Sequence, residues 1–166
     1  QVWLYTLEGN TLGDDVVGAN IVRGPYTRVA VKERLHRITA EWQSANGKDD
    51  CILLSPLTSR NSATAALASV DNGAATTSGG AGYVQCSALA LGGYTNVIVK
   101  IRDSTDDTVF ADYIEFAAIT AAPAAERKEE TATNPNRYAL VTFTWTGSGS
   151  SESATIAVGF SRKEAP

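Results

Sequence analysis

Several residue types are scarce or missing in this sequence. Its 166 residues include no methionine, one histidine and two cysteines. Because the chain begins at Gln1 and has no methionine, we expect a processed product or a fragment of a longer protein. No run of about 18 apolar residues occurs, so we expect no membrane insertion. A charged segment followed by an apolar one is also absent, so no signal peptide is expected.

The single histidine limits the kinds of catalysis that are plausible. A Ser–His–acid triad needs a histidine held beside a nucleophile. His36 instead shares one face of an alternating segment with the apolar residues Ile38, Ala40 and Trp42, which predicts a packed or interfacial histidine. No G-x-S-x-G motif marks an activated serine. We therefore expect that the protein is not an enzyme.

The acidic pairs do not form a recognisable metal or cofactor site. Asp14–Asp15, Asp49–Asp50 and the DSTDD segment at 103–107 all lie in predicted turns. DSTDD lacks the central glycine and distal glutamate of an EF-hand loop. The glycine-rich segment at 79–82 precedes a predicted strand, whereas a phosphate-binding loop precedes a helix. We expect no metal and no cofactor.

The two cysteines, Cys51 and Cys86, have a spacing that fits no zinc motif. We expect two buried, unpaired thiols, and a single disulfide stays open if their strands are adjacent. The net charge is −4 and the isoelectric point about 5.0. Nucleic-acid-binding domains usually present a basic stripe, and none is obvious, so no specific nucleic-acid binding is expected.

Alternation of apolar and polar residues predicts many β-strands. Ala139, Val141, Phe143 and Trp145 share one face of a strand, and the same period of two occurs at 97–102. Gly, Asp, Asn and Ser punctuate these segments, and we predict turns at Gly24–Pro25 and 46–50 among others. CILLSP at 51–56 is apolar throughout, which predicts a strand covered on both faces.

The spacing of these strands predicts an all-β fold. We expect an antiparallel, jelly-roll-like β-sandwich at the C-terminal side, preceded by an extended β-hairpin or strand arm. The segment at 58–81 is small, polar and glycine-rich. We therefore divide the chain into a strand-rich assembly segment at 1–57, a linker at 58–81 and a β-sandwich domain at 82–166.

Aromatic residues offer one further candidate site. Sugar rings stack on flat aromatic side chains, and Tyr94, Tyr113 and Trp3 are the candidates for such a glycan-facing platform. Trp42 and Trp145 are expected in the core, because sandwich cores also use tryptophan.

The stretch SVDNGAATTSGGAGYVQCSAL introduces a resemblance to a known group of proteins. Together with VIVKIRDSTDDTVFADYIEF, AAERKEE, NRYALVTFTWTG and ATIAVGFSRK, it resembles the C-terminal region of tailed-bacteriophage tail or major tail (tube) proteins. The resemblance is collinear and spans Ser69 to Arg162. It implies a jelly-roll sandwich of the carbohydrate-binding type, and it implies no catalytic residue.

This resemblance implies a structural virion protein, assembled in the bacterial host cytoplasm. The expected partners are copies of itself and other virion proteins, with weak glycan contact as a further candidate. Long strands such as 26–44 could add to a neighbour's sheet, and the charged segment at 31–37 suits a surface between subunits. A tail tube subunit, a tail-associated protein, a capsid decoration protein and a carbohydrate-binding module all stay open as roles.

Overall fold

The computed structural model describes residues 2–6, 10–29 and 37–162, with side-chain environments for residues 4, 10–20 and 48–162. This part of the chain contains ten β-strands and no helix. The strands are β1 (Val2–Thr6), β2 (Asp15–Val29), β3 (Arg37–Arg60), β4 (Val70–Asp71), β5 (Gly80–Ala90), β6 (Tyr94–Ser104), β7 (Ala111–Glu115), β8 (Ala124–Glu130), β9 (Tyr138–Gly147) and β10 (Ser153–Arg162).

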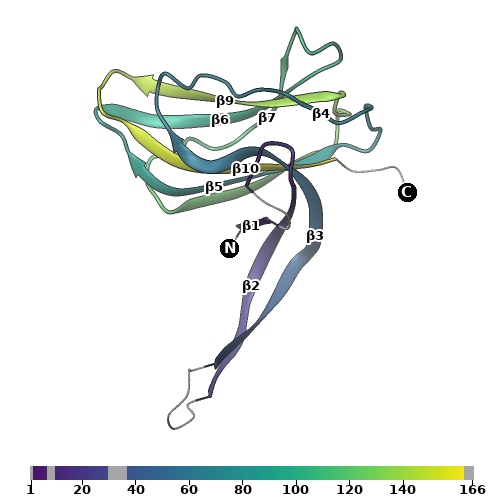
Figure 1. Ribbon diagram of the computed structural model, residues 1–166, viewed down its shortest axis with the longest axis vertical. Helices are drawn as coiled ribbons and strands as arrows, with labels where there is room; N and C mark the ends of the chain where they lie inside the picture. The colour runs from purple at the N-terminus through teal and green to yellow at the C-terminus, as the bar shows by residue number, and fades with distance from the viewer. Residues whose placement is uncertain (1, 7–9, 30–36, 163–166) are drawn as a thin grey trace.

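The strands form two antiparallel sheets that pack face to face. One has six strands in the order β1-β2-β3-β10-β5-β8, and the other has four in the order β4-β9-β6-β7. Figure 1 shows the two layers, with a long hairpin of β2 and β3 projecting away from them. The predicted all-β class, the sandwich and the preceding β-hairpin arm are therefore confirmed.

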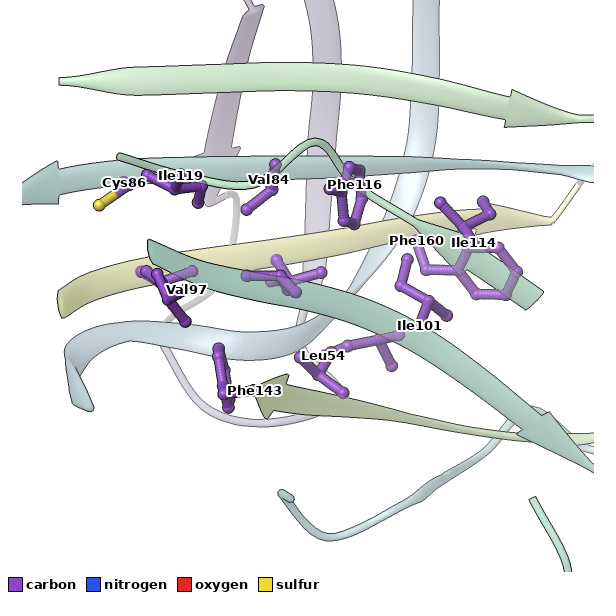
Figure 2. Close-up of a cluster of buried hydrophobic side chains, with 14 of the residues drawn as sticks. Leu54, Val84, Cys86, Val97, Ile101, Ile114, Phe116, Ile119, Phe143 and Phe160 are labelled. Atoms are coloured by element: carbon purple, nitrogen blue, oxygen red, sulfur yellow. The ribbon is translucent and has the colours of Figure 1, made fainter. Parts of the chain in front are cut away.

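A large apolar core lies between the two sheets. The six-stranded sheet contributes Leu54 and Phe160, and the four-stranded sheet contributes Val99, Val141 and Phe143, all of them buried. Figure 2 shows that side chains from both sheets point into this one cluster. The alternation predicted for β9 is confirmed, since its inward residues are buried or, at Trp145, packed against the core.

A second, smaller core lies on the other face of the six-stranded sheet. Val16, Cys51, Leu53, Ala81 and Tyr83 are buried there, with Leu4 packed against them. The sheet curls so that β1 approaches β5 and β8 as well as its neighbour β2. Because Leu53 and Leu54 face different cores, the prediction that segment 51–56 is covered on both faces is confirmed.

The glycine-rich segment assigned to a linker runs beside β9. Leu67 N–H donates to the carbonyl of Val141, and Phe143 N–H donates to the carbonyl of Ala65. The short strand β4 then pairs with the start of β9. The structure thus attaches this segment to the sandwich by backbone hydrogen bonds, and the proposed domain boundaries stay a prediction.

Two predicted turns are wrong. β2 continues through Gly24–Pro25, and β3 continues through 46–50. The register between the strands shifts near both places, as in a β-bulge. Proline has no N–H to donate, and glycine often marks a bulge, so both residues are tolerated on a strand with an unpaired edge. Within the described residues, no helix is long and apolar enough to cross a membrane.

Candidate assembly surface

The projecting hairpin is a two-stranded ribbon, which we call the β-arm, formed by residues 21–29 of β2 and 37–47 of β3. β1 pairs with β2 only over Val16–Asn20, and β10 pairs with β3 only over Ile52–Arg60. Beyond those points, the two arm strands pair with each other and with no other described strand. The β-arm therefore leaves the sandwich with both of its outer edges unpaired (Figure 1).

Unpaired strand edges have a direct chemical consequence. Each edge presents N–H and C=O groups that can pair with a further strand. A two-stranded hairpin on its own is marginally stable in water, and a third strand or a packed face is usually needed. The β-arm is therefore suited to completion by another strand or surface. The predicted intersubunit segment 31–37 lies, apart from Arg37, outside the described residues, as does His36, and the side chain of Trp42 is not among those described.

A polar cluster fixes the root of the β-arm to the far edge of the same sheet. Asp49 lies on β3, Tyr83 on β5 and Arg127 on the edge strand β8. The Arg127 guanidinium donates to Asp49 Oδ2 from Nε at 3.1 Å and from Nη2 at 2.9 Å. The Tyr83 hydroxyl also donates to Asp49 Oδ2 and accepts a hydrogen bond from Arg127 Nε at 2.9 Å.

This root cluster is largely shielded from water. The Arg127 and Asp49 side chains are only 16% and 21% exposed, and Arg127 also contacts Glu129 Oε2 at 3.0 Å. Burial raises the pKa of Tyr83, and its hydrogen bond to Asp49 raises it further, so the phenol keeps its proton to donate. The cluster links β3, close to the point where it leaves the body, to β5 and β8.

The close packing of Tyr83 also depends on a glycine in β2. A Cβ added at Gly18 would lie 2.5 Å from the Tyr83 ring, far inside normal contact distance. Cys51 lies in the same small core, and burial raises the pKa of its thiol to about 12. Cys51 and Cys86 are both buried and free, so the prediction of two unpaired thiols is confirmed.

A groove of about 590 Å³ opens beside the root of the β-arm. It lies between the six-stranded sheet, which contributes Asp15, Asp50 and Arg162, and β4 of the other sheet, which contributes Val70 and Asp71. Its apolar lining comes from Val16, Ile52, Val70 and Phe160. The groove thus combines an apolar floor with three carboxylates.

The charges around this groove are unevenly compensated. Asp71 forms a two-pronged ion pair with Arg137, at 2.7 and 2.6 Å, and this pair holds the Asp71 pKa down at about 2. Arg162 donates to the backbone carbonyls of Asn72 and Ala74 instead of to a carboxylate. Asp50 is highly exposed and lies 3.9 Å from Lys48. Within the described part of the chain, Asp15 has no ion pair.

The aromatic residues predicted to face glycans lie apart from each other. Tyr94 begins β6 and packs edge-on against Trp145, with ring centres 5.5 Å apart. Tyr113 on β7 packs edge-on against Phe160 at 5.6 Å and donates its hydroxyl to the carbonyl of Thr133. β7 pairs with the opposite end of β6 from Tyr94, so the two rings do not share a platform. The side chain of Trp3 lies outside the described residues, and a glycan role for these residues stays a prediction.

The acidic segment DSTDD forms the turn that follows β6. Asp106 Oδ1 accepts hydrogen bonds from the N–H groups of Thr108 and Val109. A hydrogen bond from the Thr108 side chain, together with these backbone groups, lowers the pKa of Asp106. Asp103 is buried and accepts from Asn136 N–H at 2.7 Å. No cluster of three or more potential metal ligands is found among the residues that the structure describes.

The root cluster and the groove are the features that sequence reasoning missed. Asp49 and Arg127 are 78 positions apart, and only the curl of the sheet brings them together. Asp49 was interpreted as a turn residue, and no local sequence pattern pairs it with Arg127. Comparisons with models of known families, with curated proteins and with solved structures find no match.

Proposed function

We propose that this chain is a structural subunit of a tailed-bacteriophage virion, which assembles with copies of itself through the β-arm. The single observation that carries the assembly part is the two-stranded arm, whose outer edges are unpaired beyond Asn20 on β2 and before Ile52 on β3. The sequence resemblance over Ser69 to Arg162 supports the virion part of the proposal.

The rigidity of the arm's root also supports this function. An arm that joins subunits must keep its direction, or the assembly would not repeat with a constant angle. The Asp49–Tyr83–Arg127 cluster links the strand that leaves the body to two further strands of the sheet. Symmetry then repeats each small contact in every copy, so modest arm contacts are sufficient for a stable assembly.

Removal of the β-arm tests this function directly. Ala19 and Lys48 are paired in the hairpin, and deletion of residues 21–46 joins Asn20 to Gly47 between them. Asn-Gly is the preferred two-residue turn of β-hairpins, so the shortened hairpin should close without strain. The sandwich and both apolar cores keep all their residues in this variant.

The full chain should form rings, tubes or other repeating assemblies in negative-stain images and light scattering, and the shortened chain should be a folded monomer. Circular dichroism and thermal unfolding of the shortened chain provide the control for folding. A full chain that stays monomeric at high concentration would refute the proposal, most clearly if the monomer bound to a glycan array. Equal assembly by the shortened chain would also refute it.

A further inference from the structure

The β-arm and the rest of the molecule carry opposite charge. The segment 21–47, which comprises the two β-arm strands and the residues 30–36 that join them, contains five Lys or Arg residues and two Glu residues, which gives a formal charge of +3. The β-arm strands alone contain three Arg residues and one Glu residue, which gives +2. The whole chain carries −4, so the residues outside segment 21–47 carry −7. The overall acidic balance therefore conceals a basic arm on an acidic body, and each copy of the chain displays both members of a complementary pair.

From this charge division we propose that the β-arm of one copy binds in the groove beside the arm root of the next copy. This inference rests on the proposed function and names the surface to which the arm docks. It makes the contact heterologous, because an arm meets a groove instead of a second arm. Repetition of such a contact produces a closed ring or an open helical filament.

The chemistry of the groove matches the arm. Asp15 and Asp50 line the groove together with apolar residues and Arg162. Within the described residues, Asp15 has no ion pair and Asp50 has only the contact with Lys48 at 3.9 Å. The described arm strands carry Arg23, Arg28 and Arg37 alongside apolar residues such as Val22 and Ile38. Arginine pairs well with carboxylates, and its stem covers apolar surface. The groove's volume of about 590 Å³ leaves space for such side chains.

The charges also argue against two alternative partners for the arm, namely a second arm and a nucleic acid. Pairing of two arms edge to edge would bring together two segments that each carry a net positive charge, and juxtaposed like charges oppose association. Binding of the arm to a nucleic acid would bring phosphates towards a body with a formal charge of −7. The groove of another copy offers the arm the carboxylates of Asp15 and Asp50, which a second arm and a nucleic acid do not.

Charge reversal separates these possibilities. One variant reverses the arm by Arg23→Glu with Arg28→Glu, and a second reverses the groove by Asp15→Lys with Asp50→Lys. A third chain carries all four substitutions and so keeps the total charge of the native chain. As a matched control, Thr144→Lys, Thr146→Lys and Glu152→Lys together add the same four positive charges as the groove variant, away from the groove residues. The concentration for half-assembly is measured for each by sedimentation.

The arm variant and the groove variant should each need on the order of ten-fold more protein for half-assembly. The four-substitution chain should regain most of the native value, and the control should assemble like the native chain. If the native chain assembles but the groove variant assembles equally well, the docking inference is wrong while the proposed function stands. If the native chain never assembles, the proposed function itself fails.

A binding assay covers the nucleic-acid alternative. Fluorescence anisotropy with a labelled 30-base-pair duplex should show no binding by the native chain at 150 mM salt. Binding that is lost in the arm variant, together with normal assembly of the groove variant, would overturn the inference and assign the arm to nucleic acid.

Discussion

At the scale of single residues, the packing of this fold depends on a few positions that are buried from water. Phe143 illustrates this in the main core, where it is 4% exposed on β9 and lies among side chains of both sheets (Figure 2). Gly18 illustrates it in the small core, where only the absence of a Cβ allows the Tyr83 ring to approach β2. In both cases, shape and volume decide whether the residue is tolerated.

Replacement of Phe143 by alanine should lower the free energy of unfolding by about 3–5 kcal/mol, because it leaves a cavity in the main core. Urea unfolding followed by tryptophan fluorescence measures the change. Thr144→Ala is the control. Thr144 is the next residue on the same strand and its side chain is exposed, so this substitution should shift the midpoint very little. A Phe143→Ala midpoint close to the native one would contradict the packing described for β9.

At the scale of elements, the curl of the six-stranded sheet brings its two edges near each other and gives the β-arm a fixed root. The ion pair between Arg127 and Asp49 lies within this curl and is mostly shielded from water. The ion pair between Arg137 and Asp71 lies at the surface, with side-chain exposures of 45% and 43%. Arg127 contacts one oxygen of Asp49 and Arg137 contacts both oxygens of Asp71, but water screens the second pair far more, so their contributions to stability should differ.

Arg127→Met should destabilise the fold by about 1–3 kcal/mol, because it leaves the shielded Asp49 carboxylate with one fewer charged partner. Arg137→Met is the matched control and should change stability much less, because water screens this surface pair. Thermal unfolding of both variants measures the difference. If both substitutions had the same effect, the root cluster would not be the stabilising link between β3 and β8 that we describe.

At the scale of the whole molecule, the chain divides into a well-packed sandwich and an arm that no other described strand covers. Two apolar cores hold the six-stranded sheet from both faces, whereas the two β-arm strands pair with each other and with no other described strand. Stability is therefore expected to be concentrated in the body. Association is then the step that completes the arm.

Hydrogen exchange should report this division. Amides at 21–29 and 37–44 should exchange quickly in dilute monomer and slowly in the assembled state, because the unpaired edges gain partners. Amides of β9 should be protected in both states, which provides the internal control. Mass spectrometry of exchanged peptides measures both. Arm amides that are equally protected before and after assembly would show that the arm is already complete within one copy.

The sequence by itself determined the strand-rich class and the inward faces of the sandwich strands. Alternation with a period of two dictates which side chains share a face, so Ala139, Val141 and Phe143 could be placed in the core. The same local rules predicted turns at Gly24–Pro25 and 46–50, where the chain forms bulges within long strands. Glycine and proline mark both kinds of irregularity, and only the pairing of the neighbouring strand distinguishes them.

Only the tertiary structure decided the root cluster, the groove and the separation of basic arm from acidic body. The root cluster joins residues far apart in the sequence, and the groove lies between two sheets, so neither has a local signal. The charges of the arm are visible in the sequence, but the sequence does not show that residues 21–29 and 37–47 pair with each other and leave the sandwich together. Such features depend on which strands become neighbours, and long-range packing sets that order.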